Sequence, residues 1–336
     1  MTVTANSHAV AISARAGAEM MRAAVIASPG RAELCECALR EPGKGEILVR
    51  IEGCGVCGSN LPVWEGKPWF SYPLAPGAPG HEGWGVIEAI GDGVKNCRSG
   101  ERVAFLSEHA FAEYDITTAA KAVAIPTEFG DTPVPGEPLA CAVNIASRSK
   151  FQSGESVAIV GVGFLGALLV QLAKMTGANM TAISRRKFAR QVAERFGADE
   201  VFEWDGSDTA KKISDARGGK GFDCVVECAG TQNSLDLATQ LTKERGRLII
   251  AGYHQDGPRQ VDMQLWNWRG LDVVNAHERD SEVYVEGMKR ALDLITAGML
   301  DTDPLYTHKF PLAELGRAME MLSLRPDGFM KALVMA

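Results

Sequence analysis

Hydrophobic and polar positions follow two patterns along the chain, and the change between them falls near Pro138. Before about Ile125, apolar and polar residues alternate in short runs that are separated by glycine and proline. Alternation with a period of two is typical of half-buried strands, and several such runs in succession predict an antiparallel barrel or sandwich. The strands expected in this part cover residues 23–26, 46–51, 85–90 and 102–106.

After Pro138, continuous apolar runs alternate with amphipathic stretches. Strands that are apolar on both faces and separated by helices indicate a doubly wound parallel sheet. The strands expected here cover 157–160, 180–184, 224–227, 247–251 and 271–275. One helix is expected to begin at 165, and two others are expected to cover 187–196 and 233–242. Residues 307–336 return to a strand, helix, strand pattern that could rejoin the first domain. The predicted fold class is therefore α/β, with a β-rich part and a Rossmann doubly wound parallel sheet.

Two segments lack this periodicity. Residues 60–80 are rich in proline, tryptophan and glycine, which predicts a long ordered loop rather than a helix or strand. Loops of that length in a compact domain are often functional. Residues 1–20 are mostly small and polar, so we expect a flexible N-terminal tail before a structural start at Met21.

Composition and charge narrow the class of protein. The chain has 336 residues, more than one hydrophobic core usually supports, so two domains are expected. The formal net charge of −7 argues against a nucleic-acid partner, because phosphate binding needs clustered Lys and Arg. No stretch approaches the roughly 18 apolar residues of a membrane span, and no signal-peptide pattern is present, so we expect a cytoplasmic protein. The eight cysteines favour metal ligation, catalysis or burial over disulfides.

A GxGxxG motif formed by Gly161, Gly163 and Gly166 follows one of the apolar strands. The first glycine permits a tight turn, the second lets the backbone approach a pyrophosphate, and the third lets the helix pack closely on the strand. Phe164 and Leu165, inside the motif, begin a helix whose free N–H groups would face the phosphates. The motif predicts a nicotinamide dinucleotide site and hydride transfer.

The next strand ends at Ser184 and is followed by Arg185 and Arg186. A site that prefers NAD would place Asp or Glu near Ser184 to bind the ribose hydroxyls. A small hydroxyl and two guanidiniums suit a 2′-phosphate instead, so we predict NADP(H) over NAD(H). The alternative is that the two arginines only begin a solvated helix face.

Cys57, His81 and Glu82 are competent zinc ligands in the segments GCGVCGSN (53–60) and GHEG (80–83). With the cofactor motif, the segments GVCGSN, GHEGWGVIEAIG, GERVA, EPLA and GVGFLG make the chain resemble the zinc-dependent medium-chain dehydrogenase/reductase superfamily, which includes alcohol, sorbitol and threonine dehydrogenases. The resemblance implies a GroES-like catalytic domain at 21–142 and 303–336 and a Rossmann domain at 143–302. These domains would flank the active-site cleft.

The resemblance also implies ligand roles. Cys57 and His81 match the catalytic zinc ligands, and Glu82 matches a residue that ligates the zinc or lies beside it. Glu137, in the segment EPLA, matches an acidic third ligand, and Cys141 is a backup whose offset fits less well. The alternatives are a structural role for Cys57 and His81, and a helix N-terminal carboxylate for Glu137.

Three further positions bear on the mechanism. Ser59 matches the family hydroxyl that moves the alcohol proton. Asn60 stands where many members have an Asp that orients the zinc-bound His; Asn can hydrogen-bond but adds no negative charge. Pro62 stands where some alcohol dehydrogenases have a proton-relaying His, so the proton must leave through cofactor hydroxyls and water. Residues 104–114 contain no cysteine, so we predict one catalytic zinc and no structural zinc.

We therefore predict hydride transfer between NADP(H) and a small secondary alcohol, polyol or carbonyl substrate. The alternatives are a zinc-independent NADPH-dependent quinone or enone reductase of the same superfamily, and a non-catalytic NADPH-binding sensor. Trp64, Trp69, Phe70 and Tyr72 could wall a substrate pocket or form the core of their loop. Strand 271–275 could pair across a two-fold axis, so a homodimer or homotetramer is expected by analogy.

Overall fold

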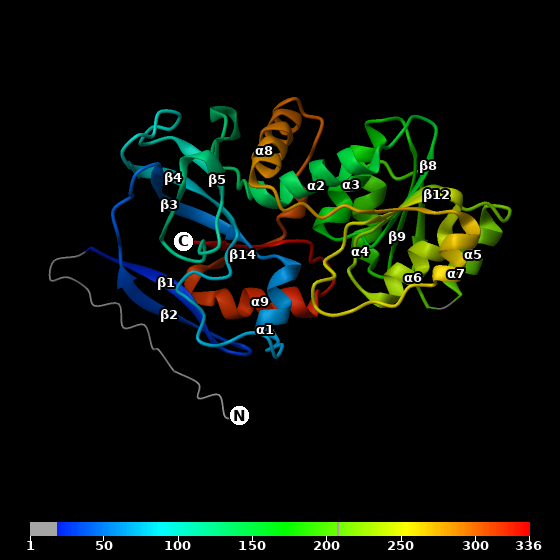
Figure 1. The fold of residues 1–336 in the computed structure, drawn as a ribbon, viewed down its shortest axis with the longest axis horizontal. Coiled ribbons are helices and arrows are strands. Elements are labelled where there is room, and N and C mark those ends of the chain that lie inside the picture. The colour runs from blue at the N-terminus through cyan, green and yellow to red at the C-terminus, as the bar shows by residue number, and fades with distance from the viewer. Residues whose placement is uncertain (1–18, 207) are drawn as a thin grey trace.

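The computed structural model describes residues 19–206 and 208–336, which form two units side by side (Figure 1). The prediction of a tail at residues 1–20 therefore lies almost entirely outside the described residues. The first strand begins at Met20, one residue before the predicted start at Met21. The predicted α/β class is confirmed, because one unit is β-rich and the other is a parallel sheet covered by helices.

The first unit contains a seven-stranded, mostly antiparallel sheet and a two-stranded hairpin. The hairpin is β1 (Met20–Ser28) with β2 (Arg31–Ala38), and the sheet contains β3 (Glu46–Gly55), β4 (Glu82–Ile90), β5 (Arg102–Leu106), β6 (Tyr114–Thr118), β7 (Ala122–Ala124), β14 (His308–Pro311) and β15 (Ala332–Met335). The order across the sheet is β14-β15-β3-β4-β5-β7, and β6 pairs with β3. Because β15 pairs antiparallel with β3, the C-terminal segment returns to the first unit.

Two strands of this sheet are longer than the sequence pattern predicts. β3 continues to Gly55, and β4 begins already at Glu82. Glycine has a low strand propensity and therefore obscures the end of β3 in the sequence. A Cβ on Gly53 would lie 2.4 Å from the Trp84 ring, so only glycine lets the two strands approach here. The added length carries the strand ends to the candidate site.

The second unit is a six-stranded sheet whose neighbouring strands are all parallel. Its strands are β8 (Ser156–Val160), β9 (Asn179–Ser184), β10 (Glu200–Glu203), β11 (Phe222–Glu227), β12 (Thr242–Ile250) and β13 (Asp272–Asn275), in the order β10-β9-β8-β11-β12-β13. The order reverses between β8 and β11, and ligands of such sheets bind in the crevice at that switch point. The pattern did not predict β10, a short edge strand with exposed glutamates at both ends.

Helices cover both faces of the parallel sheet, and others lie between the two units (Figure 1). The helices are α1 (Leu61–Trp64), α2 (Gly136–Ser149), α3 (Phe164–Lys174), α4 (Lys187–Arg195), α5 (Thr209–Ala216), α6 (Gln232–Leu241), α7 (Met263–Arg269), α8 (Ser281–Thr296) and α9 (Leu315–Leu324). Short 3-10 turns cover Gly58–Asn60, Ala119–Lys121, Thr127–Phe129, Asp303–Leu305 and Leu312–Glu314. Among the described helices, none is long and apolar enough to cross a membrane.

One buried core spans both units. It includes Trp84 of β4, Leu139 of α2, Ile159 of β8 and Met288 of α8. Helix α2 contacts β4 and β5 on one side and α3 and α8 on the other. The two units are therefore joined by packing as well as by the chain, and the candidate site lies beside that junction.

The predicted loop at 60–80 is not entirely irregular, because α1 occupies its start. Trp64 is buried, and Tyr72 donates a hydrogen bond from its hydroxyl to the Val63 carbonyl. Phe70 also packs against the core of the first unit, whereas Trp69 is 54% exposed. Trp64, Phe70 and Tyr72 therefore belong to the core of the loop.

Candidate active site

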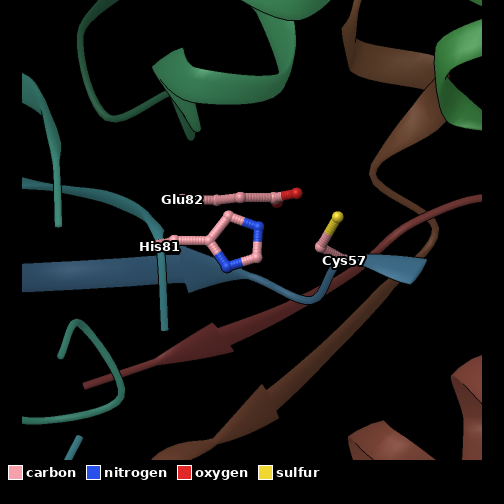
Figure 2. Close-up of side chains that lie close together, drawn as sticks. All are labelled: Cys57, His81 and Glu82. Atoms are coloured by element: carbon pink, nitrogen blue, oxygen red, sulfur yellow. The ribbon is translucent and has the colours of Figure 1, made fainter. Parts of the chain in front are cut away.

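The ends of β3 and β4 bring three candidate metal ligands together. Cys57 follows β3 after one intervening residue, and His81 immediately precedes β4, which begins at Glu82. The strands are antiparallel neighbours with Gly55 opposite Glu82, so the end of one strand meets the start of the other. One donor atom from each of Cys57, His81 and Glu82 lies within 4.8 Å of the other two, and their side chains point toward one another in Figure 2.

Glu82 is fully buried, and its carboxylate occupies space that a glycine leaves free. A Cβ on Gly55 would lie 1.8 Å from Glu82 Oε2, so any larger residue at 55 would displace the carboxylate. Lys331 Nζ donates to Glu82 Oε1 at 2.7 Å and lies 2.5 Å from Oε2, so one ammonium contacts both carboxylate oxygens. A buried carboxylate is unfavourable unless a cation compensates its charge, and Lys331 does so here.

Lys331 was not identified as a site residue from the sequence. It lies between Met330 and Ala332, just before β15, and is only 5% exposed. Burial lowers the pKa of Lys331, but the charges of Glu82 and Cys57 outweigh that effect and raise it. A single lysine inside an apolar run was the available signal, because a buried lysine is seldom found without a partner.

His81 is oriented by a backbone carbonyl. Its Nδ1 lies 2.9 Å from the Pro79 carbonyl oxygen, a contact that requires the proton on Nδ1 and leaves the Nε2 lone pair free for a ligand. Burial lowers the pKa of His81, but the hydrogen bond and charge of Cys57, with the charges of Glu137 and Glu82, raise it to about 10. The surroundings of this imidazole therefore favour a positive charge.

Asn60 forms its side-chain hydrogen bonds with backbone groups on either side of the cluster. Its Oδ1 accepts from the Cys57 N–H at 2.9 Å, and its Nδ2 donates to the Pro79 carbonyl at 3.2 Å. Asn60 is 1% exposed. Asn60 therefore links the backbone N–H of Cys57 to the Pro79 carbonyl, which in turn contacts His81 Nδ1.

Ser59 lies at the same site, and Pro62 lies away from it in the core. The Ser59 Oγ is 3.4 Å from His81 Nε2, so the hydroxyl borders the ligand cluster. Pro62 is buried in the first turn of α1. Ser59 is thus the hydroxyl that a substrate at the cluster would meet.

Glu137 and Cys141 contact each other on one face of α2. The Cys141 Sγ donates to Glu137 Oε1 at 3.3 Å and also lies 3.6 Å from the Tyr284 hydroxyl. Burial raises the pKa of Glu137 and raises that of Cys141 still further, since the nearby Glu137 charge also disfavours the thiolate. Neither residue belongs to the group whose donor atoms lie within 4.8 Å. The charge of Glu137 nevertheless reaches His81, and its place in the first turn of α2 also fits the helix-terminal alternative.

The three clustered donors fit a zinc ion. Thiolate, imidazole and carboxylate are the ligand types that zinc prefers, and three protein ligands leave one position of a tetrahedral site open. The raised pKa of His81 indicates surroundings suited to a cation.

The glycine motif has the geometry of a phosphate-binding turn. Gly161 has a φ of +97°, and a Cβ there would lie 2.8 Å from the Ala229 Cβ. A Cβ on Gly166 would lie 2.3 Å from the Gly161 carbonyl oxygen, so helix and strand approach closely. A Cβ on Gly163 would meet nothing within 4 Å, and no side chain caps the N-terminus of α3. The open space at Gly163, facing helix N–H groups in the motif that includes Phe164 and Leu165, fits a pyrophosphate.

Two arginines, Arg185 and Arg186, directly follow the carboxyl end of β9. Ser184 is buried, and the Arg185 guanidinium lies 4.1 Å from the centroid of the Trp204 ring. Arg186 donates from its guanidinium to the carbonyls of Phe329 and Val162. The sequence did not point to Trp204 or Phe329, because both lie far from the motif along the chain.

Glu227 supports the loops beside the glycine motif and was also missed. It ends β11, is fully buried, and accepts hydrogen bonds from the N–H groups of Ala229 and Gly230 at 2.8 and 2.7 Å. Its other oxygen lies 2.7 Å from His254 Nε2. Since Ala229 packs against Gly161, this carboxylate positions backbone at the dinucleotide turn.

Comparisons with known proteins agree with this geometry. The alcohol dehydrogenase GroES-like domain family matches residues 43–130, and the zinc-binding dehydrogenase family matches residues 165–296. The chain is 27% identical to the 2-dehydro-3-deoxy-L-galactonate 5-dehydrogenase of Pseudoalteromonas atlantica, over 87% of this chain and 92% of that protein. It is 28% identical to the L-threonine 3-dehydrogenase of Pyrococcus horikoshii, with the same two coverages.

A solved structure from Sinorhizobium meliloti, described as a zinc-binding dehydrogenase bound to NADP, has a TM-score of 0.81 and 27% identity. The match covers 95% of this chain and 100% of that one. The chain therefore belongs to the zinc-type medium-chain dehydrogenase/reductase superfamily. It is an oxidoreductase of that superfamily, and its cofactor is a nicotinamide dinucleotide.

Proposed function

We propose that the protein is a zinc-dependent dehydrogenase that transfers a hydride between NADP(H) and a secondary alcohol or polyol and the matching carbonyl compound. The observation that carries this proposal is the cluster of Cys57, His81 and Glu82, in which one donor atom from each residue lies within 4.8 Å of the other two. The curated relatives named for threonine and for 2-dehydro-3-deoxy-L-galactonate support a small hydroxylated substrate.

In this proposal Cys57 and His81 hold the metal, and either Glu82 or Glu137 completes the site as the third ligand. A bound zinc ion supplies a Lewis acid that lowers the pKa of a substrate hydroxyl, and a bound nicotinamide accepts or returns the hydride. The Pro79 carbonyl keeps the His81 Nε2 lone pair available, and Lys331 compensates the charge of the Glu82 carboxylate. These contacts hold the ligands in place before the metal binds.

Ser59 handles the proton. Its hydroxyl borders the cluster, so it can accept the proton that leaves the substrate oxygen during oxidation and return it during reduction. Pro62 cannot pass that proton onward, because it has no ionisable group and lies in the core. The onward path must therefore use water and the hydroxyls of the bound cofactor.

The preference for NADP(H) rests on Ser184, Arg185 and Arg186. A carboxylate at the end of β9 would repel a 2′-phosphate, and Ser184 removes that repulsion. Arg185 and Arg186 add two positive charges at the same end of the sheet. The preference is tested by comparing the Kd values of NADPH and NADH, and equal or tighter binding of NADH would contradict it.

The metal assignment is tested on protein purified without added metal. We expect one zinc per chain, with no second, structural zinc, and turnover in an NADP⁺/NADPH-coupled panel of alcohols and carbonyl compounds. Cys57→Ala should lose zinc and activity together, whereas Cys35→Ala, a matched change on β2, should keep both. Activity retained in Cys57→Ala would refute the metal mechanism and favour the zinc-independent reductase. Cofactor binding without any turnover across the panel would favour the sensor.

We further propose that two or four copies assemble through the edge of the parallel sheet. β13 ends the sheet, and the neighbouring α7 has no buried residue. Trp268 on that helix is 82% exposed, and Met263 is 59% exposed. An apolar patch beside an open strand edge is a favourable surface for pairing with a second copy.

A further inference from the structure

Four side chains form a continuous hydrogen-bonded chain at the carboxyl ends of β11 and β12. Glu227, which ends β11, has one oxygen 2.7 Å from His254 Nε2. Arg259 Nε donates to His254 Nδ1 at 3.0 Å, and Arg259 Nη2 donates to the Asp256 carboxylate. Because arginine has only donors, His254 Nδ1 must accept, and the Nε2–H of His254 donates to Glu227. This histidine therefore joins a buried carboxylate to a guanidinium and fixes the direction of both.

Arg259 also joins the two loops that follow these strands. It lies in the loop between β12 and α7, and its Nη2 donates to the carbonyl of Gly230 in the loop after β11 at 3.0 Å. The loop backbones lie close together, since a Cβ on Gly230 would be 2.4 Å from the Tyr253 carbonyl oxygen. A Cβ on Gly252 would likewise be 2.4 Å from the Gly230 nitrogen. Arg259 thus bonds across the contact between the loops and fixes their spacing.

The two loops lie where the reacting half of a dinucleotide must pass. Sheets of this kind bind ligands outside the carboxyl ends of the strands at the switch point, here between β8 and β11. Ala229, in the first loop, packs against Gly161 of the glycine motif. Burial and the charges of Asp256 and Cys57 raise the pKa of Tyr253, so the second loop faces the candidate metal site. The loops therefore connect the phosphate turn with the surroundings of Cys57, which is the path of the nicotinamide half.

We propose that Arg259, oriented by His254, is a positioning residue for hydride transfer, because it holds the two loops in the arrangement that seats the nicotinamide half of the cofactor. A guanidinium suits this role, since its planar fork donates to His254, Asp256 and Gly230 at once. A fixed surface beside the nicotinamide keeps the ring in the orientation that the transfer requires. This role rests on the dinucleotide binding of the proposed function and deepens it.

Titration calorimetry with NADPH and with 2′-phospho-ADP-ribose, which lacks only the nicotinamide, isolates this role without any turnover. Arg259→Ala should weaken NADPH about tenfold and leave the Kd of 2′-phospho-ADP-ribose within about twofold, because only the nicotinamide half loses its support. The fluorescence lifetime of bound NADPH should shorten, since the ring becomes more mobile. Arg290→Ala, which alters an exposed arginine on α8, is the matched control and should change none of these values.

Variants of His254 separate positioning from a merely structural role. The amide of His254→Gln keeps a donor toward Glu227 and an acceptor toward Arg259, so this variant should retain the wild-type NADPH affinity and lifetime. His254→Phe keeps an aromatic ring but neither hydrogen bond, so it should resemble Arg259→Ala. A merely structural role would weaken both ligands equally in Arg259→Ala and would not distinguish the two His254 variants.

Equal weakening of NADPH and 2′-phospho-ADP-ribose in Arg259→Ala would overturn the inference, and so would wild-type values in His254→Phe. If Arg259→Ala does not fold, as judged by circular dichroism, Arg259→Lys carries the same expectation, because an ammonium cannot reproduce the fork. If the wild-type protein binds only NADH, the same comparison is made with NADH and ADP-ribose. If it binds neither NADPH nor NADH, the proposed function itself fails. If it binds the cofactor and the Arg259 variants bind it equally well, only this inference fails.

Discussion

Lys331 and Glu82 form an ion pair in which both side chains are buried, next to two candidate metal ligands. Placing a charged carboxylate in the interior is unfavourable unless a cation compensates it. Lys331 contacts both carboxylate oxygens, and donor atoms of Cys57 and His81 lie within 4.8 Å of the Glu82 carboxylate. The lysine therefore compensates the charge of a carboxylate that also borders the candidate metal site.

Replacing Lys331 with Met should reveal this role. In metal-free protein the change leaves the Glu82 charge uncompensated, so the free energy of unfolding should fall by about 3–5 kcal/mol. In zinc-loaded protein the loss should be smaller, because the bound ion compensates the same carboxylate. Denaturant unfolding with and without a chelator measures both values.

Lys289→Met is the control for that experiment. Lys289 pairs with Glu286 on the surface of α8, where both side chains are more than half exposed. Exposed pairs contribute about 0–1 kcal/mol, so this variant should unfold almost as the wild type does. Equal losses in Lys331→Met and Lys289→Met would contradict the structural role of the buried pair.

At the scale of elements, α3 meets the end of β8 at three glycines that serve different purposes. Gly161 adopts a left-handed turn against Ala229, and Gly166 lets the helix approach the Gly161 carbonyl. Gly163 faces open space, so its missing side chain serves the ligand and not the packing. The packing of helix on strand and the binding of phosphate are therefore separable by mutation.

Gly163→Ala should lower only the affinity for the cofactor, whereas Gly166→Ala should lower both the thermal stability and the affinity. Gly163→Ala adds a methyl group where nothing clashes, so its Tm should stay near that of the wild type. Its affinity for NADPH should fall at least about tenfold, or ~1.4 kcal/mol, because the methyl group takes the space of the pyrophosphate. Gly166→Ala would place a Cβ 2.3 Å from a backbone oxygen, so both Tm and affinity should fall. Thermal unfolding and titration calorimetry distinguish the two, and a Gly163→Ala protein with wild-type affinity would contradict this assignment.

At the scale of the whole molecule, the C-terminal segment connects the two units. It leaves the parallel sheet, adds β14 and β15 to the first unit, and contributes Lys331 and Arg325 to the junction. In the parallel sheet, β13 is an edge strand, and Trp268 on the preceding helix α7 is 82% exposed. This edge is the surface through which we propose that copies of the chain assemble.

Trp268→Asp should weaken assembly of the protein. A buried interface tryptophan commonly contributes 2 kcal/mol or more, so the dimer dissociation constant should rise by about 30-fold or more. Light scattering after size-exclusion chromatography over a concentration series measures this shift. Trp69→Asp, which alters an exposed tryptophan of the other unit, is the matched control and should leave the mass unchanged. An unchanged mass in Trp268→Asp would place the interface elsewhere.

The sequence by itself determined the elements and chemistry that depend on local pattern. Apolar periodicity predicted the parallel sheet, and the glycine spacing predicted its phosphate turn, because both follow from residues close together along the chain. The segments around Cys57 and His81 carried the family resemblance for the same reason. Boundaries were less predictable: β3 extends through Gly53 and Gly55, whose low strand propensity is outweighed by close packing against Trp84 and Glu82.

The tertiary structure alone decided which distant residues complete the site. Lys331 lies 249 positions from Glu82, yet their ion pair depends only on β15 pairing with β3. The C-terminal segment, which returns to the first unit, also brings Phe329 to Arg186 and Arg325 to Gly58. No local pattern encodes such contacts, because they arise only when apolar surfaces that are far apart in the sequence are buried against each other. Local sequence thus specified the ligands and the phosphate turn, and long-range packing specified the charges that surround them.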